Sequence, residues 1–366
     1  MRTHRQTEGA ARAVALSLAA TVATPVAWVA HWLFSRPAFP AAIAAPRRLL
    51  SSSLGRMSYY EDAGASGVPV VLFHGASETS STYELRGLFE AFRSDRPVIA
   101  CDLPGYGFSE RRNVPYARDD YVRFVEEMLE DVSQRYGSTV DVVAVGLSGE
   151  LAGRAVLHRA RLVRSLTLIA PTGFEWAGTR GYARMAVFRV RKLVGKALET
   201  PLVGAVIHHL TTSRPAVRAR LHRATRTRPS DELVRYTHAV THHPRARRTV
   251  LSAMAGSLED PAVVDEVYDA LAVPVLFVHG DDARTPREAI DAVVTQNRRF
   301  ARVRINGTHA LPHIEQPFET ASTVREFHRS LSHKPQLRVI RGQGTGPRFD
   351  PRRSRPRSHG PTLRHA

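Results

Sequence analysis

Short apolar runs alternate with amphipathic stretches through the middle of the chain. Most of the runs are closed by Gly, Pro or Asn, which punctuate strands. Between them lie helix-like stretches such as residues 119–136 and 286–299. This alternation is typical of βαβ units around a parallel sheet. The predicted strands are residues 68–73, 97–101, 140–145, 166–170, 273–278 and 301–305.

One long interval interrupts the alternation. From about Thr172 to Glu259 the sequence is helix-like and rich in arginine, and no strand is predicted there. Its position after the strand 166–170 places it at the C-terminal edge of the sheet, where open α/β folds bind their ligands. We therefore expect a helical cap or lid over a ligand site.

The net charge of +18 is unevenly distributed over the 366 residues. It is +5 over residues 1–50, −3 over 51–171, +12 over 172–250, −4 over 251–333 and +8 over 334–366. This distribution argues against a uniformly basic nucleic-acid-binding domain, so no specific nucleic-acid partner is expected. The last segment has no apolar periodicity, and we expect a disordered basic tail.

The N-terminal segment contains a long run without charged residues. Ala13–Phe34 spans 22 positions without Asp, Glu, Lys or Arg, which is long enough to cross a bilayer as a helix. Trp28 and Trp32 lie toward its end, where aromatic rings favour a membrane interface. A membrane anchor is the leading interpretation. The alternatives are a cleaved signal peptide of a secreted protein, with Ala42–Ala44 as the cleavage site, or a buried Ala-rich helix.

These observations give a predicted organisation in five parts. They are an N-terminal basic segment with its apolar run, a first core part, the helical cap, a second core part and the basic tail. The corresponding ranges are 1–50, 51–171, 172–259, 260–333 and 334–366.

A serine stands on a predicted sharp turn at the end of the strand 140–145. The segment is Gly146-Leu147-Ser148-Gly149-Glu150, and a helical stretch follows it. On such a turn the serine is expected to be strained and exposed, with backbone N–H groups facing a developing oxyanion. Alone, this pattern is also compatible with an ordinary structural turn.

A serine nucleophile needs a base, and the base needs an orienting carboxylate. His309 follows the last predicted strand, and Asp282 follows the strand before it. Ser148, Asp282 and His309 thus each follow a parallel strand, in the chain order of an α/β-hydrolase catalytic triad.

Three further motifs carry a family resemblance. They are His74-Gly75-Ala76, the segment Asp-Leu-Pro-Gly-Tyr-Gly-Phe-Ser at 102–109, and Gly307-Thr308-His309. With the serine turn, they make the chain from about Leu54 to Leu331 resemble an α/β-hydrolase with a helical cap. The resemblance implies a mostly parallel central sheet flanked by helices, with the cap inserted after the sixth strand.

The resemblance also implies roles for individual residues. Ser148 would be the nucleophile, His309 the general base and acid, and Asp282 the acid that orients it. The backbone N–H groups of Ala76 and Gly149 would form the oxyanion hole.

The sequence departs from the family pattern at two places. Glu150 stands where the family usually has glycine for close helix–strand packing. The acid loop is one residue short, so Asp282 takes the acid position only when counted back from Pro286. Asp281 is the runner-up, and Glu175 is a more distant candidate.

The nucleophile type restricts the chemistry. Epoxide hydrolases and haloalkane dehalogenases of this fold use aspartate at the turn, whereas this chain has Ser148. We expect an esterase- or lipase-like hydrolase that cleaves a carboxylic ester, thioester or activated C–C bond through an acyl-enzyme. The alternatives are an acyltransferase and a non-catalytic binding protein of the same fold.

The expected substrate is a small-molecule or lipid-like ester. The basic segment 172–250 would lie against an anionic membrane, or its outer face would simply be solvated. No metal or other cofactor is expected, because no His/Asp/Glu cluster has ligand spacing and Cys101 is the single cysteine.

Overall fold

The computed structural model describes most of the chain between residues 40 and 332. The described residues are 40–176, 190, 195, 197–198, 200–243, 245–282 and 286–332. The apolar run 13–34 and the tail 334–366 therefore lie outside them. Of the helices within these ranges, none has both the length and the apolar character needed to cross a bilayer.

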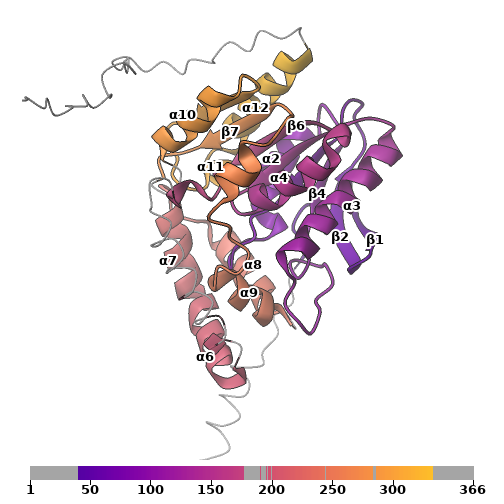
Figure 1. Cartoon of the computed structure of the whole chain (residues 1–366). Helices are drawn as coiled ribbons and strands as arrows, with labels where there is room; N and C mark the ends of the chain where they lie inside the picture. Colours follow the sequence, from indigo (N-terminus) through magenta and orange to yellow (C-terminus); the bar gives the residue numbers. More distant parts are fainter. Residues whose placement is uncertain are drawn as a thin grey trace, which may run out of the picture.

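An eight-stranded sheet forms the centre of the structure (Figure 1). Its order is β1-β2-β4-β3-β5-β6-β7-β8, and all neighbours from β4 to β8 pair in parallel. The six predicted strands are confirmed. The strands are β1 (Arg47–Ser52), β2 (Gly55–Asp62), β3 (Val70–Phe73), β4 (Val98–Cys101), β5 (Val140–Val145), β6 (Val163–Ile169), β7 (Val275–His279) and β8 (Phe300–Arg304).

The antiparallel hairpin β1–β2 at one edge was not predicted. β1 has the sequence RRLLSS and four of its six residues are exposed, so it contains no apolar run that would mark a strand. β2 pairs antiparallel with both β1 and β4, which places the hairpin at the end of the sheet.

Helices cover both faces of the sheet because successive strand residues point to opposite sides. In β3, Val71 and Phe73 join one apolar cluster, whereas Val70 and Leu72 join the other. The first cluster includes residues of α3 and α4, and the second includes residues of α2 and α12. The flanking helices are α2 (Arg86–Phe92), α3 (Arg118–Tyr136), α4 (Ser148–Arg159), α10 (Arg287–Gln296), α11 (Pro312–Glu315) and α12 (Pro317–Ser332).

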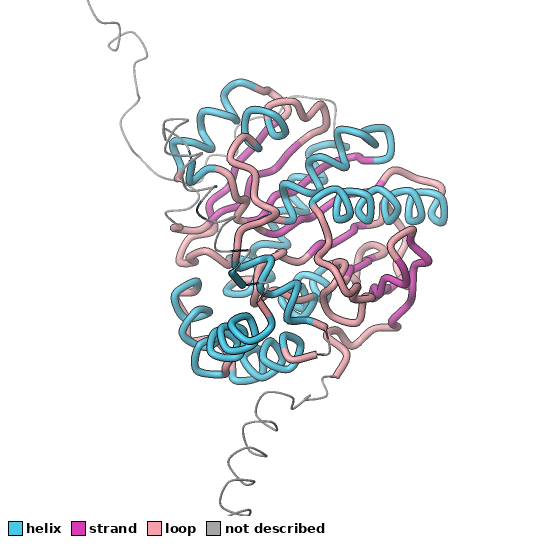
Figure 2. The backbone as a smooth tube through the Cα atoms, turned by 60° about the horizontal axis from the view of Figure 1, so that its bottom comes forward, coloured by secondary structure: helices cyan, strands magenta, loops and turns pink. Residues whose placement is uncertain are grey.

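The helical insertion lies between β6 and β7, as predicted, and its helices gather on one side of the sheet (Figure 2). Prolines stand in the first turns of α6 and α7, where a missing N–H costs nothing. Ser230 caps α8 by accepting a hydrogen bond from the backbone of Leu233 at 3.2 Å. The insertion contains α6 (Pro201–Thr212), α7 (Arg214–Ala224), α8 (Asp231–Thr241) and α9 (Ala246–Met254).

Candidate active site

Ser148 opens α4 directly after β5 and a two-residue turn. Gly146 has a backbone φ of +54°, a left-handed conformation that favours glycine. Ser148 itself is helical and only 1% exposed, so the expectation of a strained, exposed serine is wrong. Gly146 makes the sharp change of direction, and the serine therefore keeps ordinary backbone angles.

The hydroxyl of Ser148 donates a hydrogen bond to the main-chain carbonyl of His74, at the end of β3. The His74 ring is fixed on both sides. Nε2 accepts from the backbone N–H of Leu103 at 3.1 Å, and Nδ1 donates to the carbonyl of Gly75 at 2.6 Å. Burial lowers the pKa of His74 to about 4, so the ring is neutral and the loop after β3 is held in place.

The same loop is held by a carboxyl group. The N–H of Gly75 donates to Oε1 of Glu84 at 2.5 Å, and burial raises the pKa of Glu84 to about 8. The next N–H along the loop, that of Ala76, makes no hydrogen bond within the described residues. In contrast, the N–H of Gly149 donates to the carbonyl of Gly146 at 2.9 Å. Nothing in the local sequence distinguishes Glu84 from an exposed acid, and it was not predicted.

His309 lies on the loop after β8, as expected. Its Nδ1 donates to the main-chain carbonyl of Asp281 at 2.6 Å, so Nε2 is the ring nitrogen that can accept a proton. Its backbone N–H donates to Glu315 at 2.6 Å. Among the hydrogen bonds of the described residues, none joins the side chains of Ser148 and His309.

The three candidate acids lie in different surroundings. The Asp281 carboxylate accepts from Arg226 at 2.8 Å and from Arg304 at 3.2 Å. Glu175 accepts from the backbone N–H of Gly173 at 2.8 Å. Asp282 follows β7 and immediately precedes the undescribed residues 283–285. The hydrogen bond given for the His309 ring within the described part of the chain goes to a main-chain carbonyl and not to a carboxylate.

Glu150 connects the serine helix to both ends of the cap. Its side chain is buried, Oε1 accepts from the hydroxyl of Thr172, and Oε2 accepts from the backbone N–H of Asp260 at 3.0 Å. Burial raises the pKa of Glu150 to about 8. The close packing of this helix is provided instead by Gly153, because a Cβ at that position would lie only 2.8 Å from Cγ1 of Val267.

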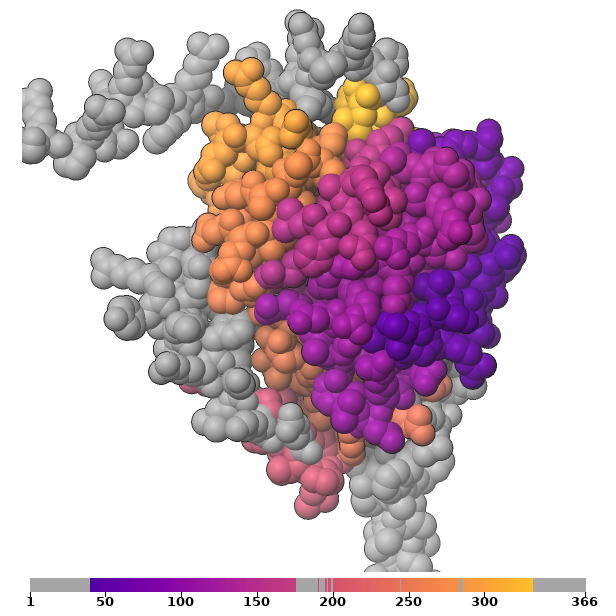
Figure 3. All heavy atoms as spheres, turned by 45° about the vertical axis from the view of Figure 1, so that its right-hand side comes forward, coloured from indigo at the N-terminus to yellow at the C-terminus, as the bar shows by residue number. Residues whose placement is uncertain are grey.

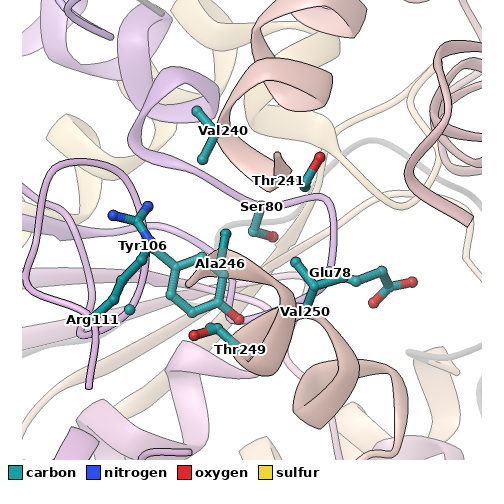
Figure 4. A pocket seen from close by; sticks show the side chains of 10 residues that line it. Glu78, Ser80, Tyr106, Arg111, Val240, Thr241, Ala246, Thr249 and Val250 are labelled. Carbon is teal, nitrogen blue, oxygen red and sulfur yellow. The ribbon is translucent and has the colours of Figure 1, made fainter. Parts of the chain in front are cut away.

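A hollow lies between the core loops and the cap (Figure 4). The hollow is small: its cavity volume is about 10 Å³, room for about one water molecule, within about 230 Å³ of empty space that includes open solvent. Ser148 does not line the hollow, but Tyr106 does. The Tyr106 ring packs edge-on against the His74 ring, with 5.1 Å between the two ring centroids. Two residues, Tyr106 and His74, therefore lie between the hollow and Ser148. Its lining residues are Glu78, Ser80, Gly105, Tyr106 and Arg111 from the core, and Val240, Thr241, Ala246, Thr249 and Val250 from the cap.

Four histidines meet in the cap beside this hollow, since the ring of His208 hydrogen-bonds to the main-chain carbonyl of the lining residue Thr241. The ring centroid of His242 lies 4.1 Å from that of His238. It lies 5.3 Å from the ring centroid of His208 and 5.3 Å from that of His209. Burial lowers the pKa of all four. Within the ranges given above, no group of three or more His, Cys, Asp or Glu side chains is arranged to hold a metal ion.

The chain belongs to the alpha/beta hydrolase family, whose sequence model matches residues 70–323. A 2-hydroxy-6-oxo-6-(2'-aminophenyl)hexa-2,4-dienoic acid hydrolase from Metapseudomonas resinovorans is 22% identical over 73% of this chain and 86% of the relative. A haloalkane dehalogenase from Bradyrhizobium diazoefficiens is 31% identical over 32% of this chain, and the match covers only 36% of the dehalogenase. Another, from Mesorhizobium japonicum, is 31% identical over 46% of this chain and 52% of the dehalogenase.

Solved structures agree on the fold. A serine hydrolase involved in carbazole degradation matches with a TM-score of 0.60 at 18% identity, covering 78% of this chain and 99% of the other. A thermophilic esterase from Thermogutta terrifontis matches with a TM-score of 0.58 at 18% identity, and the match covers 78% of this chain and 99% of the esterase. The α/β-hydrolase fold is therefore confirmed, and hydrolysis is the general chemistry of the family.

Proposed function

We propose that the protein is a serine hydrolase that cleaves a carboxylic ester, or a thioester or activated C–C bond, through an acyl-enzyme. Ser148 is the nucleophile, His309 is the general base and acid, and Asp282 orients His309. The N–H groups of Ala76 and Gly149 stabilise the oxyanion, and that of Gly149 has to turn from the Gly146 carbonyl toward it.

The step balances with these groups alone. Oγ of Ser148 bonds to the carbonyl carbon while its proton moves to Nε2 of His309, and the carbonyl oxygen becomes the oxyanion. The proton then passes to the departing alcohol as the C–O bond breaks. The oxygen of a water molecule then bonds to the acyl carbon while His309 takes its proton, and His309 returns that proton to Oγ of Ser148 as the acyl C–Oγ bond breaks and the acid is released.

One observation carries this proposal. Ser148 stands at the C-terminal end of β5 against the loop after β3, and the N–H of Ala76 in that loop has no partner in the described structure. A serine there also separates this chain from haloalkane dehalogenases, which use aspartate. The tautomer of His309 leaves Nε2 able to accept a proton. Geometry without substrate need not show the Ser148–His309 bond, which commonly forms only in the loaded site.

The choice of Asp282 rests on the surroundings of its neighbour. The Asp281 carboxylate already binds two guanidinium groups, from Arg226 and Arg304. Asp282 lies one residue farther along the same loop and is the carboxylate that counting back from Pro286 selects.

Covalent labelling with a fluorophosphonate probe tests the proposal. The wild-type protein should be labelled, and Ser148→Ala should lose all labelling. The control Ser257→Ala, at an exposed residue in the turn after α9, should be labelled as the wild type is. Labelling that persists in Ser148→Ala would assign the nucleophile elsewhere.

A non-catalytic binding protein is the second candidate. The burial of Ser148 and the commitment of its hydroxyl to His74 favour it. A folded wild-type protein that the probe fails to label would support this candidate over the hydrolase.

A further inference from the structure

The polarity of α6 is the reverse of that expected for a surface helix. Its buried positions include His208, His209 and Thr212. Its exposed positions are apolar, and four of the eight large exposed hydrophobic side chains in the described structure lie on this helix. They are Leu202 at 78%, Val203 at 46%, Val206 at 43% and Leu210 at 58% exposure.

These four side chains form one continuous face. Leu202, Val206 and Leu210 are spaced four residues apart, which stacks them along the helix, and Val203 lies beside the first. We call this set the α6 apolar face. The helix has the sequence PLVGAVIHHLTT and contains no Asp, Glu, Lys or Arg. It lies at the end of the cap remote from the sheet (Figures 1 and 3).

Basic side chains follow this face directly. Residues 201–230 contain six arginines and no acidic residue. Arg218 and Arg220 have acidic partners, Asp231 and Glu78. Arg214 and Arg223 are exposed at the two ends of α7, and within the described residues neither has an acidic partner.

We propose that the α6 apolar face docks on an anionic phospholipid bilayer, with Arg214 and Arg223 at the lipid phosphates. An exposed apolar stripe followed by basic side chains combines the two features by which a protein surface binds anionic lipid. Long apolar side chains enter the acyl region, while guanidinium groups bind phosphate oxygens.

The dimensions of the face favour a bilayer over a second copy of the chain. Twelve helical residues are about 18 Å long and about 10 Å wide, which gives roughly 200 Å². A stable protein interface buries about 800 Å² on each partner. Pairing two copies would also bring their arginines together, whereas anionic lipid neutralises them.

Docking there would place the bilayer against the helix that packs on α9, which lines the hollow. Ile207 of α6 packs with Leu251 of α9 in a small apolar cluster. α9 in turn supplies Ala246, Thr249 and Val250 to the hollow. The docking itself does not depend on catalysis. The conclusion that the ester arrives from the bilayer rests on the proposed function.

A fluorophore on the face tests the docking in the full chain. Cys101 is fully buried and its pKa is raised well above normal by burial, so an introduced cysteine is the reactive one. Leu210→Cys carries a nitrobenzoxadiazole label. The matched control is Leu49→Cys, because Leu49 is 51% exposed on the edge strand β1. Because the signal is local to the label, binding through another segment does not by itself produce it.

The label at residue 210 should shift to the blue and brighten roughly two-fold or more with vesicles containing about one quarter phosphatidylglycerol. Pure phosphatidylcholine vesicles should give less, and about 0.5 M salt should weaken the response. Residue 49 should not respond. Changing Arg214 and Arg223 together to Gln should reduce the response at residue 210.

Three results would overturn the docking. They are no response at residue 210, an equal response at residue 49, and a change at residue 210 that depends on protein concentration without vesicles, which would indicate a second copy. Fluorophosphonate labelling of the same preparations tests the proposed function separately. A vesicle response without fluorophosphonate labelling would contradict only the hydrolase proposal. Labelling without a vesicle response would contradict only the docking proposal.

Discussion

The hydroxyl of Ser148 has to change its partner before it can react. In the structure it donates to the main-chain carbonyl of His74, and rotation about one side-chain bond releases it. A neutral hydrogen bond contributes about 1 kcal/mol net. A substrate that breaks the bond between Ser148 and His74 on binding therefore loses little binding energy in doing so. A buried serine in this state is therefore compatible with a nucleophile at rest.

At the residue scale, the two adjacent aspartates should differ sharply. Asp282→Asn should lower kcat on the order of 10⁴-fold, by analogy with the serine-protease acid, because His309 loses the group that stabilises its charge. Asp281→Asn, the matched control, should change kcat little, because its carboxylate binds Arg226 and Arg304. Steady-state hydrolysis of a nitrophenyl ester measures both. The reverse order of effects would assign the acid role to Asp281.

At the scale of elements, Glu150 joins the serine helix to the two ends of the cap. Glu150→Gly restores the family's usual residue but removes both hydrogen bonds, to Thr172 and Asp260. Loss of two such bonds should destabilise the protein by about 1–3 kcal/mol. Urea unfolding measures the loss, and limited proteolysis should show earlier cleavage in the cap.

Thr172→Val provides the graded control for this prediction. It removes one of the two bonds at nearly constant volume, so it should lower stability by about half as much. Glu150→Gly with unchanged unfolding and proteolysis would show that the connection carries no stability.

How much the sequence predicts differs between elements. Buried parallel strands such as β5 are continuous apolar runs and are therefore recognisable. The edge strand β1 exposes most of its side chains, so its formation depends on pairing with β2. The positions of Ser148 and His309 at strand ends follow from residue order. Their hydrogen-bond partners do not, because both are main-chain carbonyls, which every residue has.

Contacts between distant segments cannot be predicted from the local sequence either. Glu150 looked like a packing defect because its partners, Thr172 and Asp260, are brought to it only by the cap. In the same way, His208 and His242 are separated by 34 positions in sequence and meet only when α6 packs near α8. Local pattern carries no information on either contact.

At the scale of the whole molecule, buried titratable groups should set the pH of greatest stability. Burial lowers the pKa of five histidines from 6.5 to about 4, or about 3 for His313, so below about pH 6.5 the unfolded chain binds more protons. Their contribution is present above that pH and is lost as the pH falls. The five are His74, His208, His242, His313 and His328.

Two carboxyl groups act in the opposite direction. Burial raises the pKa of Glu84 and Glu150 from 4.5 to about 8, so the folded chain keeps their protons while the unfolded chain loses them. Their contribution is present at low pH and is lost as the pH rises toward 8. Each proton bound in only one of the two states changes the free energy of unfolding by about 1.4 kcal/mol per pH unit. Below pH 6.5 the effect of the five histidines on stability is therefore larger than that of the two carboxyl groups, and above pH 7 the effect of the carboxyl groups is larger.

Stability should therefore be greatest between about pH 6.5 and 7 and fall on the order of 4 kcal/mol by pH 5. Urea unfolding from pH 5 to 8 measures the curve. The double variant Glu84→Gln/Glu150→Gln keeps hydrogen-bonding side chains but cannot titrate, so its stability should no longer decline from pH 7 to 8. A wild-type maximum at pH 5, or a decline unchanged in the double variant, would contradict this assignment. The acid limb should persist in the double variant, because the five buried histidines still become charged only on unfolding.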